Sequence, residues 1–337
     1  MKSTTDFAYY LSTYLEKQLP GVQGNSENTI ISYRDGIILF LQYMSTVEKT
    51  KPEKIEFNLI TKKTIENFLL WLEKNRNCSL TTRNQRLAIL HSFFKYVGAE
   101  EPKYIYLCQQ ILSIPVKKAA KTMPKYITLE AVKLILEMPN NTTLSGRRDL
   151  VILSLMYDTG ARVQEVVDLV VSDLRLYEPE TIKLTGKGNK QRIIPIMKPT
   201  ANLLKQYLFE NVLSTPEMNV APLFTNNMHQ KMTRAGIAYI LNKYAVKAQN
   251  ENPDLVPFKL TPHVFRHSRA MHLLQANVNL VYIRDLLGHV SVQTTELYAR
   301  ADSLMKRKAL EKVQSITPSD MPIWQKDKDL LTWLKSL

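Results

Sequence analysis

Apolar residues recur at helical spacing in four segments of the first hundred residues. Each segment follows a residue that can cap or precede a helix, and its apolar positions fall on one face. Pro20-Gly21 is expected to end the first segment, because proline has no backbone N–H to donate. We therefore predict a small bundle of four amphipathic helices: Asp6 to Leu19, Glu27 to Ser45 behind Ser26, one opened by Thr61, and one opened by Ser79 or Thr81 and running through Tyr96.

The second part of the chain mixes helical periodicity with one alternating stretch. Thr181 to Ile196 reads as two short strands around a Lys187-Gly-Asn-Lys190 turn, which predicts a β-hairpin. Gly288 follows the short predicted helix Leu280 to Leu287 as a C′ glycine, and the runs Gln293 to Arg300 and Leu304 to Val313 come after it. The remaining segments predict helices after Thr128, at Leu150 to Tyr157, at Thr200 to Phe209 and from about Leu260. The fold class predicted is mainly α with a small antiparallel β-sheet.

A linker divides the two patterns. Residues 113–126 hold two prolines and four lysines and have no strong apolar periodicity. We therefore predict an N-terminal helical domain at 1–112, a linker at 113–126, a second domain at 127–316 and a C-terminal tail helix at 317–337. The tail is apolar enough to require a protein surface, either its own domain or a neighbouring protomer.

Charge indicates the class of partner, and cysteine usage indicates the redox compartment. The formal net charge is +14, and the excess lies in residues 116–315, which carry 28 Lys and Arg against 17 Asp and Glu. This distribution favours a polyanion as partner without selecting DNA. Cys78 and Cys108 form neither a C-x-x-C motif nor a disulfide framework, which favours a reducing cytoplasm. No apolar run predicts export or membrane anchoring.

The stretch from Leu260 to Ala299 holds the candidate chemistry. His263 and Arg266 lie three residues apart in a predicted helix and therefore share one face, and the Gly288 turn presents His289. Tyr298 follows nine residues later. Cations that neutralise a phosphate, imidazoles that move protons and a phenol that becomes the covalent partner are the equipment for attack on a phosphodiester.

The pattern His263-x-x-Arg266-His267, Leu287-Gly288-His289 and Tyr298 resembles the tyrosine recombinase (phage integrase) family, and more closely its compact Xer-like members. Two upstream positions match as well. Arg162, after a Thr-Gly turn, matches the family's first catalytic arginine, and Lys187 matches its hairpin lysine. The resemblance implies a C-shaped DNA clamp made of a SAM-like core-binding domain and a catalytic domain.

Two other readings of these residues fit less well. His263 and His267 have the spacing of a zinc pair, but the glutamate of the H-E-x-x-H motif is absent. The Gly186-Lys187-Gly188 turn lacks the spacing of a phosphate-binding loop, and Asn189 stands where a hydroxyl is needed. Lys187 or Tyr298 alone is more often structural, but separate coincidences do not explain six positions in this order and spacing.

The resemblance also implies roles for individual residues. Arg162 and Arg266 would bind the phosphate, Tyr298 would form a 3′-phosphotyrosyl bond, and Lys187 would protonate the departing 5′-oxygen. His263 would assist proton transfer and His289 would hydrogen-bond the phosphate, while Glu165 and His267 would brace the arginines. No metal, ATP or other cofactor would be required. Further phosphate contacts are expected from a set of polar side chains in both domains: Arg34, Arg83, Asn84, Arg86, Thr233 and Arg234.

The function predicted is site-specific DNA strand exchange by a homotetramer on paired recombination sites, in the cytoplasm at the nucleoid. A type IB topoisomerase-like nicking and closing enzyme and a catalytically silent DNA-binding regulator remain alternatives. Chromosome-dimer resolution, phage integration and transposon movement are not separable from the residues, although the C-terminal tail slightly favours a mobile genetic element.

Overall fold

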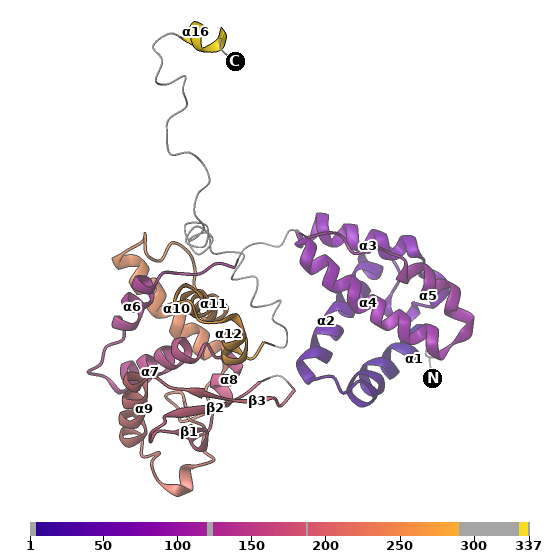
Figure 1. Cartoon of the computed structure of the whole chain (residues 1–337). Coiled ribbons are helices and arrows are strands. Elements are labelled where there is room, and N and C mark those ends of the chain that lie inside the picture. The colour runs from indigo at the N-terminus through magenta and orange to yellow at the C-terminus, as the bar shows by residue number, and fades with distance from the viewer. Residues whose placement is uncertain (1–4, 120–123, 187, 290–329, 336–337) are drawn as a thin grey trace. The chain divides into compact units, whose positions relative to one another are not determined.

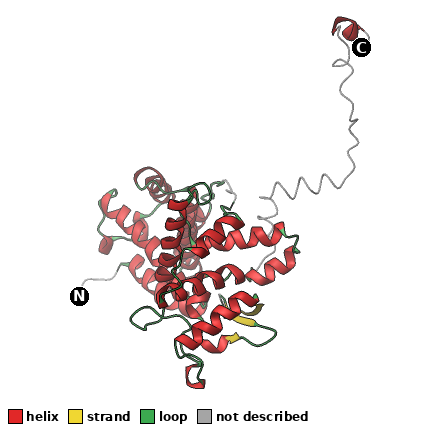
Figure 2. Ribbon diagram, turned by 90° about the vertical axis from the view of Figure 1, so that its left-hand side faces the viewer, coloured by secondary structure: helices red, strands yellow, loops and turns green. Residues whose placement is uncertain are grey.

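The computed structural model describes residues 5–119, 124–186, 188–289 and 330–335. The chain divides into two compact units, Met1–Lys121 and Thr122–Leu337. Both are built mainly from helices, and the strands of the described residues are confined to one small sheet in the second unit (Figures 1 and 2). The predicted fold class, mainly α with a small antiparallel sheet, is confirmed.

The first unit is a helical bundle around an aromatic-rich core. Phe40, Phe57, Phe68, Phe93 and Phe94 are among its fully buried side chains. Side-chain caps define three of its helices, as expected for hydroxyls that accept an otherwise unpaired backbone N–H. Its helices are α1 (Asp6–Thr13) capped by Thr5, α2 (Glu27–Thr46), α3 (Lys62–Asn75) capped by Thr61, α4 (Leu80–Glu100) capped by Ser79, and α5 (Ile105–Leu112).

Two features of this unit correct the sequence-based prediction. The first helix does not end before Pro20, because the chain continues as a π-helix, η1 (Tyr14–Val22), with Pro20 inside it. Tyr14 and Leu19 are fully buried in the core, so tertiary packing holds this turn although proline donates no hydrogen bond. The bundle also contains α5, which was not predicted; Cys108 and Ile111 bury it against the core.

The second unit packs its helices and its sheet around a separate apolar core. The sheet has the order β1-β2-β3 and is antiparallel throughout, with Leu184 on β2 opposite Arg192 on β3. In Figure 1 the three strands lie side by side at one edge of this unit. Its elements are α6 (Leu129–Glu137), α7 (Leu144–Thr159), α8 (Val163–Asp168), β1 (Leu174–Arg175), β2 (Thr181–Thr185), β3 (Gln191–Pro195), α9 (Lys198–Glu210), α10 (Arg234–Glu251), α11 (Pro262–Gln275), α12 (Leu280–Leu287) and α16 (Leu330–Lys335).

Helix α11 joins the start of this unit to its core. The Ile127 N–H donates to Ser268 Oγ at 3.0 Å, and the Ile127 carbonyl lies 3.0 Å from His272 Nε2. His272 Nδ1 in turn lies 2.8 Å from the Tyr157 hydroxyl on α7. These buried polar groups therefore satisfy one another and fix the register of α11 against α7.

No helix in the described ranges combines the length and the apolar content that crossing a membrane requires.

Candidate active site

The C-terminal turn of α12 presents three successive backbone carbonyls to three arginines. Arg192 Nε donates to Leu286 O at 2.9 Å, Arg266 Nη2 donates to Leu287 O at 2.6 Å, and Arg162 Nη2 donates to Gly288 O at 3.0 Å. The last carbonyls of a helix have no partner within the helix and carry partial negative charge, which suits guanidinium donors. The three cations come from the N-cap of α8, from β3 and from α11, so one helix end gathers groups that are far apart in sequence.

Glu165 is the carboxylate between two of these arginines. Its Oε1 accepts from Nη1 of both Arg162 and Arg192, at 2.8 and 2.9 Å, and its Oε2 accepts from Arg192 Nη2 at 2.7 Å. Oε2 also accepts the Arg162 backbone N–H at 2.8 Å, at the start of α8. Burial of Glu165 raises its pKa and is the largest single influence, but the hydrogen bonds and charges of Arg192 and Arg162 together hold the pKa below its usual value. Glu165 is therefore buried and ionised, and its carboxylate holds the guanidiniums of Arg162 and Arg192 in place.

Two glycines let the backbone approach these arginines. Gly160 ends α7 with φ +58° and its carbonyl accepts Arg266 Nη1 at 2.7 Å, while Gly288 ends α12 with φ +64°. Left-handed backbone of this kind favours glycine. At Gly288 a Cβ would lie 2.8 Å from Arg192 Nη1. The sequence prediction that Gly288 ends this helix at Leu287 is confirmed.

Histidines stand around the buried guanidinium of Arg266. Burial, followed by the charges of Arg266 and Arg162, lowers the pKa of His289 to about 4. Burial also lowers the pKa of His267, helped by His263 and Arg266. His289 and His267 are therefore neutral at pH 7, and each neutral imidazole offers one donor and one acceptor nitrogen.

A cavity of about 570 Å³ opens beside this cluster. Its lining includes Arg162, Arg192, Arg284 and Lys190, against a single acidic residue, Asp285. The Arg162 side chain is 35% exposed, whereas that of Arg192 is 14% exposed. The arrangement suits an oxyacid group such as a phosphate, because several cations converge there against the single carboxylate of Asp285, which pairs with Arg284.

The structure brings together six of the eight residues proposed for chemistry. Arg162, Glu165, Arg266, His267 and His289 are linked by the contacts and charges given above, and His263 lies close enough for its charge to act on His267. The other two, Lys187 and Tyr298, lie outside the described residues. Within the described ranges, no three His, Cys, Asp or Glu side chains form a cluster suited to a metal ion.

Two of the predicted phosphate contacts in the first unit are bonded to the chain at residues 115–117. Arg83 is only 5% exposed and donates from Nη1 to Pro115 O at 3.3 Å, near Glu73. The Asn84 amide donates to Lys117 O at 2.7 Å and accepts the Lys117 N–H at 3.2 Å. We therefore assign Arg83 and Asn84 an additional structural role, which is to hold the chain at residues 115–117.

The other four predicted contacts differ in their surroundings. Arg34 is exposed on α2 beside Asp35, and Arg86 is half-buried, with Nη1 3.5 Å from Ser32 O. Thr233 caps α10 by accepting the Gly236 N–H at 3.0 Å, and Arg234 is exposed on the first turn of that helix. An exposed cation on a helix N-terminal turn is accessible to a phosphate.

Sequence reasoning missed Arg192. Arg192 lies in the predicted hairpin, at an inward position of β3. Its partners are Glu165 and Leu286, which are 27 and 94 residues away in the sequence. A charged residue on the inward face of an otherwise apolar strand was the available signal, because such a residue needs a buried partner.

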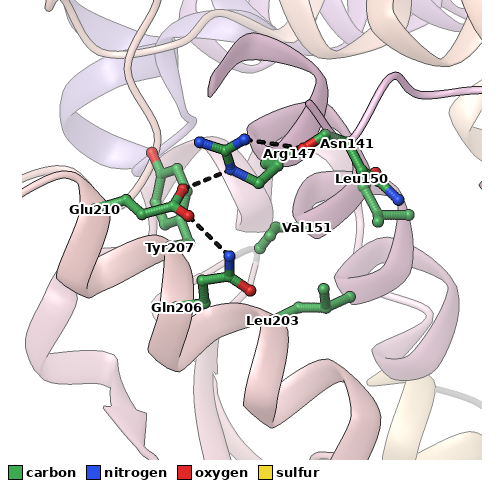
Figure 3. A pocket seen from close by; sticks show the side chains of 8 residues that line it. All are labelled: Asn141, Arg147, Leu150, Val151, Leu203, Gln206, Tyr207 and Glu210. Carbon is green, nitrogen blue, oxygen red and sulfur yellow. Dashed lines mark hydrogen bonds and ion pairs between the residues drawn. The ribbon is translucent and has the colours of Figure 1, made fainter. Parts of the chain in front are cut away.

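A second cavity, of about 180 Å³, lies apart from these residues, between α7 and α9 (Figure 3). Arg147 at its edge donates to Glu210 Oε2 at 2.8 Å and to Asn141 O at 2.9 Å, as the dashed lines show. Burial raises the pKa of Tyr207 to about 12. The arginine is thus already paired, and this cavity gathers no group poised for chemistry.

Comparison with known proteins follows the same division of the chain. The model of the phage integrase family matches residues 125–304, and the model of the phage integrase N-terminal SAM-like domain matches residues 14–103. Tyrosine recombinase XerC of Thermodesulfovibrio yellowstonii is 32% identical over 302 residues, covering 88% of this chain and 93% of its own length. Tyrosine recombinase XerD of Listeria innocua is 33% identical over 285 residues, covering 84% and 91%. The crystal structure of XerH site-specific recombinase bound to palindromic difH substrate, a post-cleavage complex, has a TM-score of 0.68 at 22% identity, covering 92% and 90%.

Proposed function

The chain belongs to the phage integrase family of tyrosine recombinases, and on this basis we propose how its residues carry out site-specific recombination of DNA. The enzyme cleaves and rejoins DNA strands and exchanges them between two sites. The observation that supports the assignment of the site is the convergence of Arg162 and Arg266 on the last carbonyls of α12, beside a cation-lined cavity.

Charge neutralisation is the first requirement of the reaction. A phosphodiester carries a negative charge that repels a nucleophile, and the pentavalent transition state adds to it. Arg162 and Arg266 stay protonated at any working pH and hold their guanidiniums in fixed directions, because carbonyls at Gly288, Leu287 and Gly160 accept from them. We assign both arginines to the scissile phosphate.

Proton transfer is the second requirement. Tyr298 attacks the phosphorus and forms a 3′-phosphotyrosyl bond, while the 5′-oxygen leaves and takes a proton from Lys187. His263 assists proton transfer at the phenol, and neutral His289 hydrogen-bonds a phosphate oxygen. Attack by the 5′-hydroxyl of a second DNA end reverses the step. The bond energy is kept in the covalent intermediate, so no cofactor is needed.

The assembly follows from the same reasoning. We propose that the two units are the core-binding and catalytic domains, with boundaries at 1–112, 113–126 and 127–316, and that they close around duplex DNA at the nucleoid. A homotetramer holds paired sites, and the tail at 317–337, whose Leu331 and Leu334 are exposed on α16, packs on a neighbouring protomer. Movement of a mobile element is the biological role that we propose.

Covalent capture tests this function. The full-length protein is mixed with nicked duplexes of randomised sequence, and DNA that stays attached in detergent is sequenced and its attachment site mapped. We expect an adduct at Tyr298 and none with Tyr298→Phe, while Tyr177→Phe, at an exposed tyrosine, serves as the matched control. Strand joining between two labelled copies of the selected site then distinguishes recombination from nicking and closing. Absence of any adduct, or an adduct at another residue, would refute the proposal.

A further inference from the structure

Arg192 makes more contacts within the site than the assigned reaction uses. Its Nε donates to Leu286 O at 2.9 Å, Nη1 donates to Glu165 Oε1 at 2.9 Å, and Nη2 donates to Glu165 Oε2 at 2.7 Å. It therefore binds the carboxylate with two nitrogens and the helix end with the third. Arg192 belongs to β3, so these contacts also tie the hairpin to α8 and to α12.

The charges of this cluster show what Arg192 contributes. Glu165 is buried and touches two guanidiniums, those of Arg162 and Arg192. Without Arg192 the carboxylate would have Arg162 as its cation within hydrogen-bond reach, and that pair would be neutral. With Arg192 present, the three groups together keep one positive charge. Buried ion pairs of this kind need every lone pair satisfied.

Exposure indicates which arginine faces the cavity. The side chain of Arg162 is 35% exposed and that of Arg192 is 14% exposed. All three nitrogens of Arg192 donate to protein acceptors, whereas Nε of Arg162 makes no contact among the hydrogen bonds of the described residues. Arg162 is therefore placed to meet a phosphate, and Arg192 stands behind it.

We propose that Arg192 is a positioning residue for DNA cleavage, which takes up the charge of Glu165 and fixes its carboxylate so that the charge of Arg162 remains available to the scissile phosphate. This inference rests on the proposed function. It assigns to Arg192 a role through Glu165 and Arg162, with no contact to the DNA.

The proposal makes a specific statement about paired substitutions. Arg192→Gln leaves Glu165 to pair with Arg162 alone, which cancels the charge of Arg162, and we expect single-turnover cleavage at saturating DNA to fall by about 10²-fold, the size of loss that follows misplacement of a catalytic group. Glu165→Gln in that background removes the carboxylate and restores the free charge of Arg162. The double variant should therefore cleave at least as fast as Arg192→Gln, although Glu165→Gln alone is slower than the unaltered protein, because residues that act as a unit are not additive. Arg192→Lys keeps the charge and should lose less than Arg192→Gln.

Arg284→Gln is the matched control. Arg284 lines the same cavity, pairs with its neighbour Asp285, and has no hydrogen bond or ion pair to Glu165 among the described residues. The fold-loss of cleavage rate in Arg284→Gln should therefore multiply with the fold-loss in Glu165→Gln when the two substitutions are combined. Multiplicative losses for Arg192 and Glu165 would overturn the proposal. So would equal losses for Arg192→Lys and Arg192→Gln, or an Arg192→Gln effect seen only as weaker DNA binding, since the latter identifies a phosphate ligand.

A DNA-free measurement separates this inference from the proposed function. Carbon-13 NMR of labelled glutamate follows the titration of Glu165 in the unliganded protein. The Glu165 pKa, which the two arginines lower in the folded protein, should rise in Arg192→Gln and stay unchanged in Arg284→Gln. An unchanged value in Arg192→Gln refutes the charge balance whether or not the protein cleaves DNA. A raised value together with no adduct from the unaltered protein would instead refute the function alone.

Discussion

Substitution of Gly288 by alanine perturbs the site at one atom. Gly288 has φ +64°, and an added Cβ would lie 2.8, 3.0 and 3.1 Å from Nη1, Cζ and Nε of Arg192. The guanidinium cannot swing aside freely, because Leu286 O and both oxygens of Glu165 accept from it. The new methyl group must therefore displace either the turn of α12 or the guanidinium.

The expected cost has two parts. An alanine in left-handed backbone costs about 1–2 kcal/mol. Displacing Arg192 weakens hydrogen bonds to a charged group, which contribute about 1.5–3 kcal/mol each. We therefore expect Gly288→Ala to lower the free energy of unfolding by about 2.5–5 kcal/mol, the sum of the backbone cost and one weakened hydrogen bond. Cleavage should fall by about 10²-fold, since Arg162 binds the carbonyl of the same residue.

Gly24→Ala separates the backbone cost from the cost of displacing Arg192. Gly24 has φ +58° but nothing within 4 Å of its Cβ position, and it lies in the other unit. Urea denaturation should show only the backbone cost for Gly24→Ala, and adduct formation on the selected duplex should not change. The reasoning is refuted if Gly288→Ala loses no more stability than Gly24→Ala and forms adduct at the unaltered rate.

Two further predictions concern pH and the linker. Burial and neighbouring cations lower the pKa of His289 from 6.5 to about 4, so the unfolded chain binds the extra proton between these values. Above pH 6.5 the imidazole is neutral in both states, whereas at pH 5 the free energy of unfolding should be lower by about 2 kcal/mol, because the unfolded chain then binds the proton and the folded protein does not. Urea denaturation of the unaltered protein and of His289→Gln at pH 7.5 and 5 measures this difference. Equal pH slopes for the two proteins would contradict it. Asn84→Ala removes both hydrogen bonds to the Lys117 backbone, so trypsin should cleave faster after Lys117, whereas Asn58→Ala, at an exposed asparagine bonded to Glu56, should not change the rate. Unchanged cleavage in Asn84→Ala would show that these bonds do not hold the linker.

Helix boundaries could be predicted where a local cap decides them. Thr61, Ser79 and Thr128 all accept a backbone N–H three residues on, as the sequence pattern indicates. The end of the first helix could not be predicted in this way. Pro20 stays inside a helical turn because burial of the side chains around it outweighs the lost hydrogen bond.

The same distinction between local and long-range contacts applies to the residues of the site. The positions of Arg162, Arg266 and His289 in the sequence follow motifs with short spacing, and resemblance to a family located them. The partners of Arg192 depend on how β3, α8 and α12 meet in space, and no periodicity in the chain encodes that meeting. Asn84 and Arg83 have contacts of the same kind, because both are bonded to the chain at residues 115–117, about thirty residues away, and no local pattern encodes those contacts.

The end of α12 explains why arginine, and not lysine, occupies these positions. Arg266 spans two carbonyls that terminate different helices, Gly160 O and Leu287 O, with its two terminal nitrogens at 2.7 and 2.6 Å. A lysine ammonium is a single point and cannot bridge both acceptors in a fixed plane. Because Arg162 and Arg192 bind the adjacent carbonyls, the direction of each guanidinium is set by the same turn. His289 follows that turn directly, and its backbone N–H donates to Arg284 O at 3.0 Å, so the geometry of one helix terminus positions the three guanidiniums and the backbone of this histidine.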